Sequence, residues 1–181
     1  MLLTIISALY YAMPGMLANM SPLFFKGWLK PLAKPVDLGL KIKGKRLLGD
    51  HKTFRGFVLG MITGMLAGFL QYIIRDFAII QSISYIDYTF VKSIGIGLAF
   101  GFAALLGDSA KSLVKRQVGI RPGKPFIPFD QVDYIVGIIA FSYLFRPMTW
   151  QMIAALVLIG PLLHLAFTKL GYFLKIRKER W

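Results

Sequence analysis

The sequence predicts an all-α, polytopic integral membrane protein that forms a single membrane domain over residues 1–181. Three observations lead to this fold class. The chain is 56% hydrophobic with a mean hydropathy of +0.63. Only 17% of its residues are charged, whereas soluble domains carry about a quarter. The apolar residues gather in long runs separated by basic segments, an arrangement that a soluble core of this size does not need.

Five apolar runs are candidate transmembrane helices. The first is interrupted by Pro14 and Pro22. Because no basic residue precedes Lys26, we expect it to be a retained helix rather than a secretory signal. The second and third carry glycines every fourth residue, a spacing that allows close helix contact within the chain or in a homodimer. The fourth is so short that it either draws acidic residues to the edge of the hydrocarbon or forms a half-length helix that lines a wet cavity. The runs cover about 2–25, 56–74, 90–107, 132–145 and 149–171.

The net charge of +14 is unevenly distributed. Nineteen of the 22 lysines and arginines lie in segments 26–55 and 108–131 and in the tail from residue 169. Only Arg75, Lys92 and Arg146 remain for the other side. Because lysine and arginine accumulate in cytoplasmic loops, we expect the N-terminus outside and the C-terminus in the cytoplasm of a cell-membrane protein. The charge is then largely a topological signal, and no nucleic-acid partner is expected.

Three aspartates stand at the ends of apolar runs. Asp108 ends the third run, and Asp130 and Asp133 begin the fourth. Carboxylates at a membrane boundary need a compensating cation. The chain has no cysteine and two histidines, so magnesium suits this donor set better than zinc. We therefore predict a metal site on these three aspartates, while a helix N-terminal cap is the alternative for the second and third.

The third run is expected to continue as a helix through DSAKSLVKR. Asp108, Lys111, Ser112 and Lys115 then share one helix face, with Arg116 beside them. Such a face can hold a metal and a phosphate chain together, which makes these residues the catalytic candidates. An ordinary ion pair on a solvated helix end is the alternative.

The first cytoplasmic loop ends in GKRLLGDHKTFRGF, directly before the second run. It differs from a phosphate-binding P-loop, because Asp50 stands where that motif needs lysine. Cations at a helix N-terminus still favour an anion, and part of this charge belongs to topology. The candidate nucleotide contacts are Lys45, Lys52, Thr53 and Arg55, together with Lys111 and Lys115. His51 and His164 are not expected to be catalytic.

The segment GDSAKSLVKRQVGIRPGKPFIPFDQVD resembles the signature region of membrane CTP-dependent cytidylyltransferases that make CDP-diacylglycerol. That family carries Gly-Asp, then S-x-x-K-R, then a Pro/Gly-rich loop ending in D-R-x-D. The chain departs from it in several places: Gln131 replaces the arginine, Arg55 stands where glutamate is usual, PGKPF replaces P-G-H-G-G, and the chain is shorter. These departures match the compact archaeal branch, the CDP-archaeol synthases, which the sequence resembles over nearly its whole length, including GDHKTFRG.

The resemblance implies a magnesium-dependent transfer of CMP from CTP to 2,3-di-O-geranylgeranylglyceryl phosphate, with release of pyrophosphate. The residues by themselves indicate a metal-dependent, phosphate-handling site at a membrane surface, but neither the nucleotide nor the lipid. The alternatives are a CTP-dependent lipid kinase and a small ion channel or transporter with interfacial acids. A CDP-alcohol phosphotransferase is disfavoured, because most of its D-x-x-D-G pattern is missing.

Overall fold

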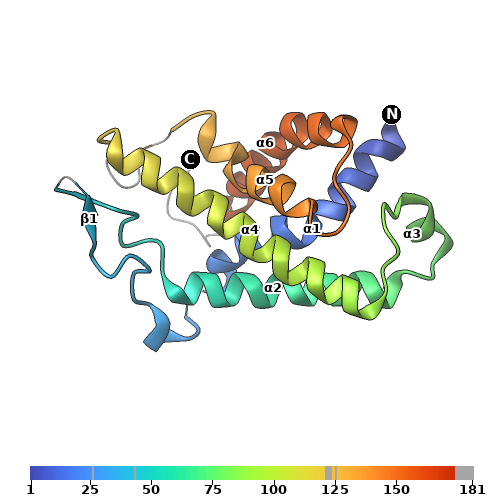
Figure 1. Ribbon diagram of the computed structural model, residues 1–181, viewed down its shortest axis with the longest axis horizontal. Coiled ribbons are helices and arrows are strands. Elements are labelled where there is room, and N and C mark those ends of the chain that lie inside the picture. Colours follow the sequence, from blue (N-terminus) through green and yellow to red (C-terminus); the bar gives the residue numbers. More distant parts are fainter. Residues whose placement is uncertain (26, 43, 121–123, 125, 174–181) are drawn as a thin grey trace.

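The computed structural model describes residues 1–25, 27–42, 44–120, 124 and 126–173. This part of the chain is mostly helical (Figure 1). The long helices are α1 (Leu2–Phe24), α2 (Phe54–Ile74), α4 (Phe90–Gln117), α5 (Phe129–Ser142) and α6 (Trp150–Phe173). The connections contain the 3-10 turn η1 (Lys30–Leu32), the hairpin β1 (Lys41–Ile42) and β2 (Lys45–Arg46), and the short helix α3 (Ala78–Ile83).

Length and composition make the protein a multi-pass membrane protein. Among the described residues, α1, α2 and α4 are long and apolar enough to cross a membrane, and α6 contains a shorter apolar stretch at Trp150–Ala166. The predicted continuation of the third run is confirmed, because α4 extends to Gln117. At about 1.5 Å per residue this helix is about 42 Å long, more than the roughly 30 Å of a hydrocarbon core. It is therefore long enough to extend beyond the apolar layer.

Helix α4 lies at the centre of the bundle and contacts α1, α2 and α5. The hairpin, the start of α2, the end of α4 and the start of α5 lie at one end of the molecule, and the N-terminus and α3 lie at the opposite end (Figure 1). Between the ends, α1, α4, α5 and α6 enclose an apolar core. Its largest fully buried members include Tyr11, Phe100, Ile135, Ile138 and Met152.

The predicted glycine contact lies between α2 and α4, within the chain. A Cβ atom added to Gly64 would overlap the Gly97 carbonyl oxygen and lie 3.0 Å from the Gly101 Cα. Only glycine permits this approach of two backbones. Close packing of this kind drives helix association in lipid. The stripe is therefore occupied by an intramolecular contact and gives no support to a homodimer.

The predicted interruption of the first run at Pro14 is wrong, because α1 is continuous from Leu2 to Phe24. Proline lacks the N–H that would bond the carbonyl four residues earlier, which here belongs to Tyr10. The fully buried Gln71 of α2 donates its Nε2 to that carbonyl oxygen at 2.6 Å. A side chain of a neighbouring helix thus replaces the missing bond, which is how membrane helices tolerate proline.

Candidate functional site

The three predicted metal-ligand aspartates converge on one point, the ammonium of Lys111. Its Nζ lies 3.1 Å from Asp108 Oδ1, 3.0 Å from Asp130 Oδ1 and 2.5 Å from Asp133 Oδ2. The lysine and Asp108 belong to α4, and the other two aspartates to the start of α5. Residues 25 positions apart in the sequence therefore form one cluster at the end of α4.

Two more lysines complete the charges of this cluster. Lys52, from the first loop, pairs with Asp108. Lys115, one turn beyond Lys111, lies 3.2 Å from Asp130 Oδ1 and donates to the Lys124 carbonyl oxygen at 2.6 Å. We define the acid-lysine cluster as these three carboxylates and three ammonium groups: Asp108, Asp130, Asp133, Lys52, Lys111 and Lys115.

A glycine brings the two helices of the cluster together. Gly107 precedes Asp108 in α4, and a Cβ there would overlap the Asp133 carbonyl oxygen of α5 and lie 3.0 Å from the carbonyl carbon. On the next turns of the same interface, Gly137 of α5 makes a similar approach to Ala103. Small residues at both positions set the close spacing of α4 and α5, and with it the distance between their aspartates.

Neither aspartate of α5 forms the helix cap that was the alternative interpretation. The N-cap residue is Pro128, and no side chain caps the helix. Asp130 Oδ2 instead accepts the Phe126 N–H at 2.6 Å, and Asp133 Oδ1 accepts the Tyr134 N–H at 2.6 Å. Each carboxylate still has an oxygen directed at Lys111.

Asp37, which the sequence analysis did not single out, organises the first loop. Its buried carboxylate accepts hydrogen bonds from the Arg46 guanidinium and from the N–H groups of Gly39, Leu48 and Gly49. Burial by itself would raise the pKa of Asp37, but these four donors hold the pKa well below its ordinary value. Segment 26–55 has two acids, Asp37 and Asp50, among nine lysines and arginines, and this was the available sequence signal.

The ordered loop delivers Lys52 to the cluster. The Lys52 carbonyl oxygen accepts the Val36 N–H at 2.7 Å, and Pro35 and Thr53 form an isolated antiparallel bridge. The hairpin docks on α4 through Lys45, whose Nζ donates to the Gln117 carbonyl oxygen at 2.6 Å. The first loop and the end of α4, which are remote in sequence, are thereby joined.

The remaining predicted site residues differ in where they lie and in what they contact. Thr53 is the N-cap of α2 and accepts the Gly56 N–H, with Arg55 partly buried in the first turn. The Ser112 hydroxyl donates to the Asp108 carbonyl oxygen at 2.9 Å, so it is used inside α4. Arg116 donates Nη1 to the Ile120 carbonyl oxygen, while its buried Nε has no acceptor among the described residues. The neighbouring Arg121 lies outside the described residues.

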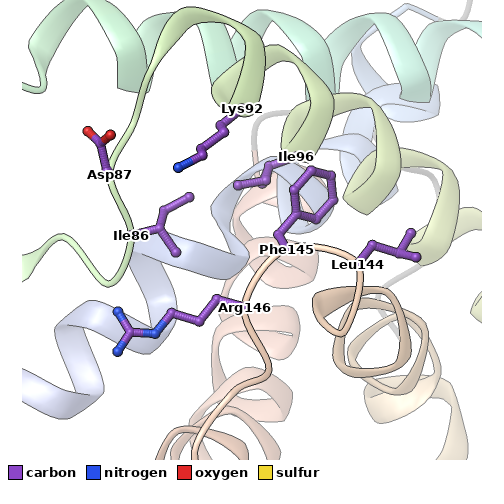
Figure 2. A pocket seen from close by; sticks show the side chains of 7 residues that line it. All are labelled: Ile86, Asp87, Lys92, Ile96, Leu144, Phe145 and Arg146. Carbon is purple, nitrogen blue, oxygen red and sulfur yellow. The ribbon is translucent and has the colours of Figure 1, made fainter.

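Neither histidine is a member of the acid-lysine cluster. His51 is exposed, and His164 stacks on Tyr134 with ring centroids 6.1 Å apart, as expected for a helix contact. A pocket of about 500 Å³ is lined by parts of segments 86–96 and 144–146 (Figure 2). It includes Lys92 and Arg146 but none of the predicted site residues.

The donor set of the acid-lysine cluster suits a hard divalent cation such as magnesium, which prefers carboxylate oxygens and retained waters. In the described part of the chain, no group of three acidic or histidine side chains is already arranged around a metal position. The Lys111 ammonium occupies the point on which the carboxylates converge. The chemistry of the residues fits magnesium, provided that this ammonium can move aside.

Proteins of one family match this chain over nearly its whole length. The family model CarS-like, CDP-archaeol synthase, matches residues 1–181. The CDP-archaeol synthase of Methanocaldococcus jannaschii is 34% identical, covering 97% of this chain and 96% of the relative. That of Methanosarcina mazei is 37% identical, with 93% and 99% covered. A solved structure described as an intramembrane enzyme for archaeal membrane lipid biosynthesis has a TM-score of 0.73 and 32% identity, with 88% and 91% covered. The chain therefore belongs to the CarS-like family of CDP-archaeol synthases.

Proposed function

We propose that this protein is a CTP-dependent cytidylyltransferase that transfers CMP from CTP to 2,3-di-O-geranylgeranylglyceryl phosphate. The products are a CDP-activated ether lipid and pyrophosphate. Family membership supports this activity over a lipid kinase or an ion channel. The structural observation that carries the site assignment is the convergence of Asp108, Asp130 and Asp133 on one cation position.

The reaction is a displacement at the α-phosphorus of CTP. A phosphate oxygen of the lipid forms the new bond, and the bond from the α-phosphorus to the oxygen bridging the β-phosphorus breaks. The bonding pair leaves with pyrophosphate. A lipid phosphate is already ionised near neutral pH, so the site needs no strong general base, and neither histidine is a member of the acid-lysine cluster.

The cations of the site bring two anionic reactants together. Lys111, Lys115 and Lys52 lie within the cluster, and Arg116 has a buried Nε that lacks an acceptor among the described residues. We assign these groups to the triphosphate and to the leaving pyrophosphate, where charge-assisted hydrogen bonds are strongest. Magnesium, held by Asp108, Asp130 and Asp133, would supply further neutralisation of phosphate charge.

We place the site on the cytoplasmic side, with five spans and the N-terminus outside. Each of the five apolar runs overlaps a helix (α1, α2, α4, α5 or α6), and α1, α2 and α4 are long and apolar enough to cross a membrane. The start of α2, the end of α4 and the start of α5 lie at one end of the bundle, away from the N-terminus (Figure 1). Segments 26–55 and 108–131 hold 14 of the 22 basic residues, as expected for cytoplasmic loops.

The experiment that tests the function is a product analysis with purified protein in detergent, lipid phosphate, magnesium and labelled CTP, ATP, UTP or GTP. The proposal expects pyrophosphate and a CMP-bearing lipid from CTP. Release of CDP with a doubly phosphorylated lipid would indicate a kinase instead. Ion flux in liposomes without any nucleotide turnover would indicate a channel.

A further inference from the structure

Lys111 has an unusual place for a lysine expected to bind phosphate. Its ammonium is the shared partner of all three carboxylates, with one oxygen of each within 3.1 Å. An ammonium has three N–H donors and no acceptor, so it can offer one hydrogen bond to each aspartate. Its side chain is 14% exposed and that of Asp133 is 4% exposed, so water contributes little to holding these charges.

The same point is where a metal bound by these aspartates would sit. Magnesium bonds oxygen at about 2.0–2.1 Å, shorter than the ammonium contacts of 2.5 to 3.1 Å. The three carboxylates are therefore held slightly too far apart for a metal. They cannot close on a metal while the lysine remains between them.

The charge of the cluster leads to the same conclusion. Three carboxylates face three ammonium groups, so the cluster is neutral without any ligand. A divalent cation entering alone would leave an excess of two positive charges in a partly buried site, which is unfavourable. A cation that enters together with a nucleoside triphosphate brings compensating negative charge. The phosphates also give the displaced ammonium a new partner.

We propose that Lys111 is a stand-in for the metal: it occupies the metal position in the nucleotide-free protein and yields it only when a nucleoside triphosphate arrives. This inference rests on the proposed function and adds to it the order in which metal and nucleotide bind. Metal and nucleotide bind as a pair, and the protein alone has weak affinity for divalent cations. In the loaded site, the ammonium of Lys111 contacts phosphate oxygens rather than aspartates.

The test is the binding of Mn²⁺, measured from the electron paramagnetic resonance signal of the free aqueous ion, on detergent-solubilised protein without nucleotide. Lys111→Met should bind Mn²⁺ at least tenfold more tightly than the wild type. Adding Asp133→Asn to that variant should remove the gain. The matched control is Lys92→Met, which removes the same charge from the other end of α4 and should bind like the wild type.

Equal Mn²⁺ affinity of the wild type and Lys111→Met would overturn the proposal. If that variant does not fold, the wild type alone decides. Its complex with CTP should take up Mn²⁺ at least tenfold more tightly than the protein or CTP separately, and equal uptake without CTP would overturn the idea. Pyrophosphate release by the wild type is measured in parallel, so failure of the stand-in role is distinguishable from failure of the cytidylyltransferase assignment.

Discussion

Replacing Gly107 by alanine should damage the site without touching any charged group. Alanine is intrinsically better than glycine in a helix by about 1 kcal/mol, so helix propensity alone predicts a more stable protein. The structure predicts the opposite. The new Cβ would overlap the Asp133 carbonyl oxygen and lie 3.0 Å from its carbon, and both atoms belong to the backbone of α5 and cannot rotate away.

The size of the effect follows from this overlap. Carbon atoms normally approach to about 3.5–4.0 Å, so α4 and α5 must separate by roughly 1 Å to accept the methyl group. Overpacking of this kind costs about 1–3 kcal/mol, which cancels or exceeds the gain in propensity. The same displacement moves Asp133 away from Asp108. Misplacing reacting groups by about 1 Å can reduce the rate by about 100-fold.

The assay is pyrophosphate release from CTP, together with thermal unfolding of the purified variant in detergent. The matched control is Gly95→Ala in the same helix, where the added Cβ would only reach the Phe145 ring at 3.4 Å. That ring is partly exposed and can shift, so the control should keep wild-type activity and be at least as stable as the wild type. Wild-type activity in Gly107→Ala would refute the argument that this contact sets the distance between the aspartates.

Three further predictions concern residues that hold the frame of the site. Gln71→Leu should lower the unfolding free energy by about 1–3 kcal/mol, because it leaves the Tyr10 carbonyl oxygen buried without a donor; thermal unfolding measures this, and an unchanged midpoint would contradict it. The lowered pKa of Asp37 stabilises the fold above the carboxyl pKa of the unfolded chain, about 3.9, and this contribution is lost as the pH falls further. Acid unfolding of Asp37→Asn should therefore depend less on pH below about 4 than that of the wild type, and parallel curves would count against the loop description. Lys52→Met should reduce turnover by about tenfold or more by removing a partner of Asp108, whereas Lys34→Met, an exposed lysine of the same loop, should leave turnover unchanged.

Helical periodicity explains how much of the site the sequence could predict. The apolar runs give the long helices, and the continuation of α4 puts Asp108, Lys111 and Lys115 on one face. Carboxylates next to apolar runs also mark Asp130 and Asp133. These inferences are local, because each depends only on residues within a few turns of one helix.

Contacts between remote segments were beyond sequence reasoning. Gly107 appears only as the residue before Asp108 until α5 is packed against it. Gln71 is one polar residue in an apolar run, and its reason is a proline 57 positions earlier. Asp37 gains its role when the chain returns with Arg46, Leu48 and Gly49 around it. The central position of Lys111 also depends on this packing, since a helical face alone pairs it only with Asp108.

The central claim is that aspartates of α4 and α5 act as one unit in nucleotide transfer. A double-mutant cycle on pyrophosphate release tests it most directly, with Asp108→Asn, Asp133→Asn, the double variant and the exposed Asp76→Asn as control. We expect each single variant to lose about 100-fold or more in rate and the double variant to be little worse than either, because groups that act as a unit are not additive. Near wild-type rates in the single variants, or losses that simply multiply in the double variant, would contradict the account.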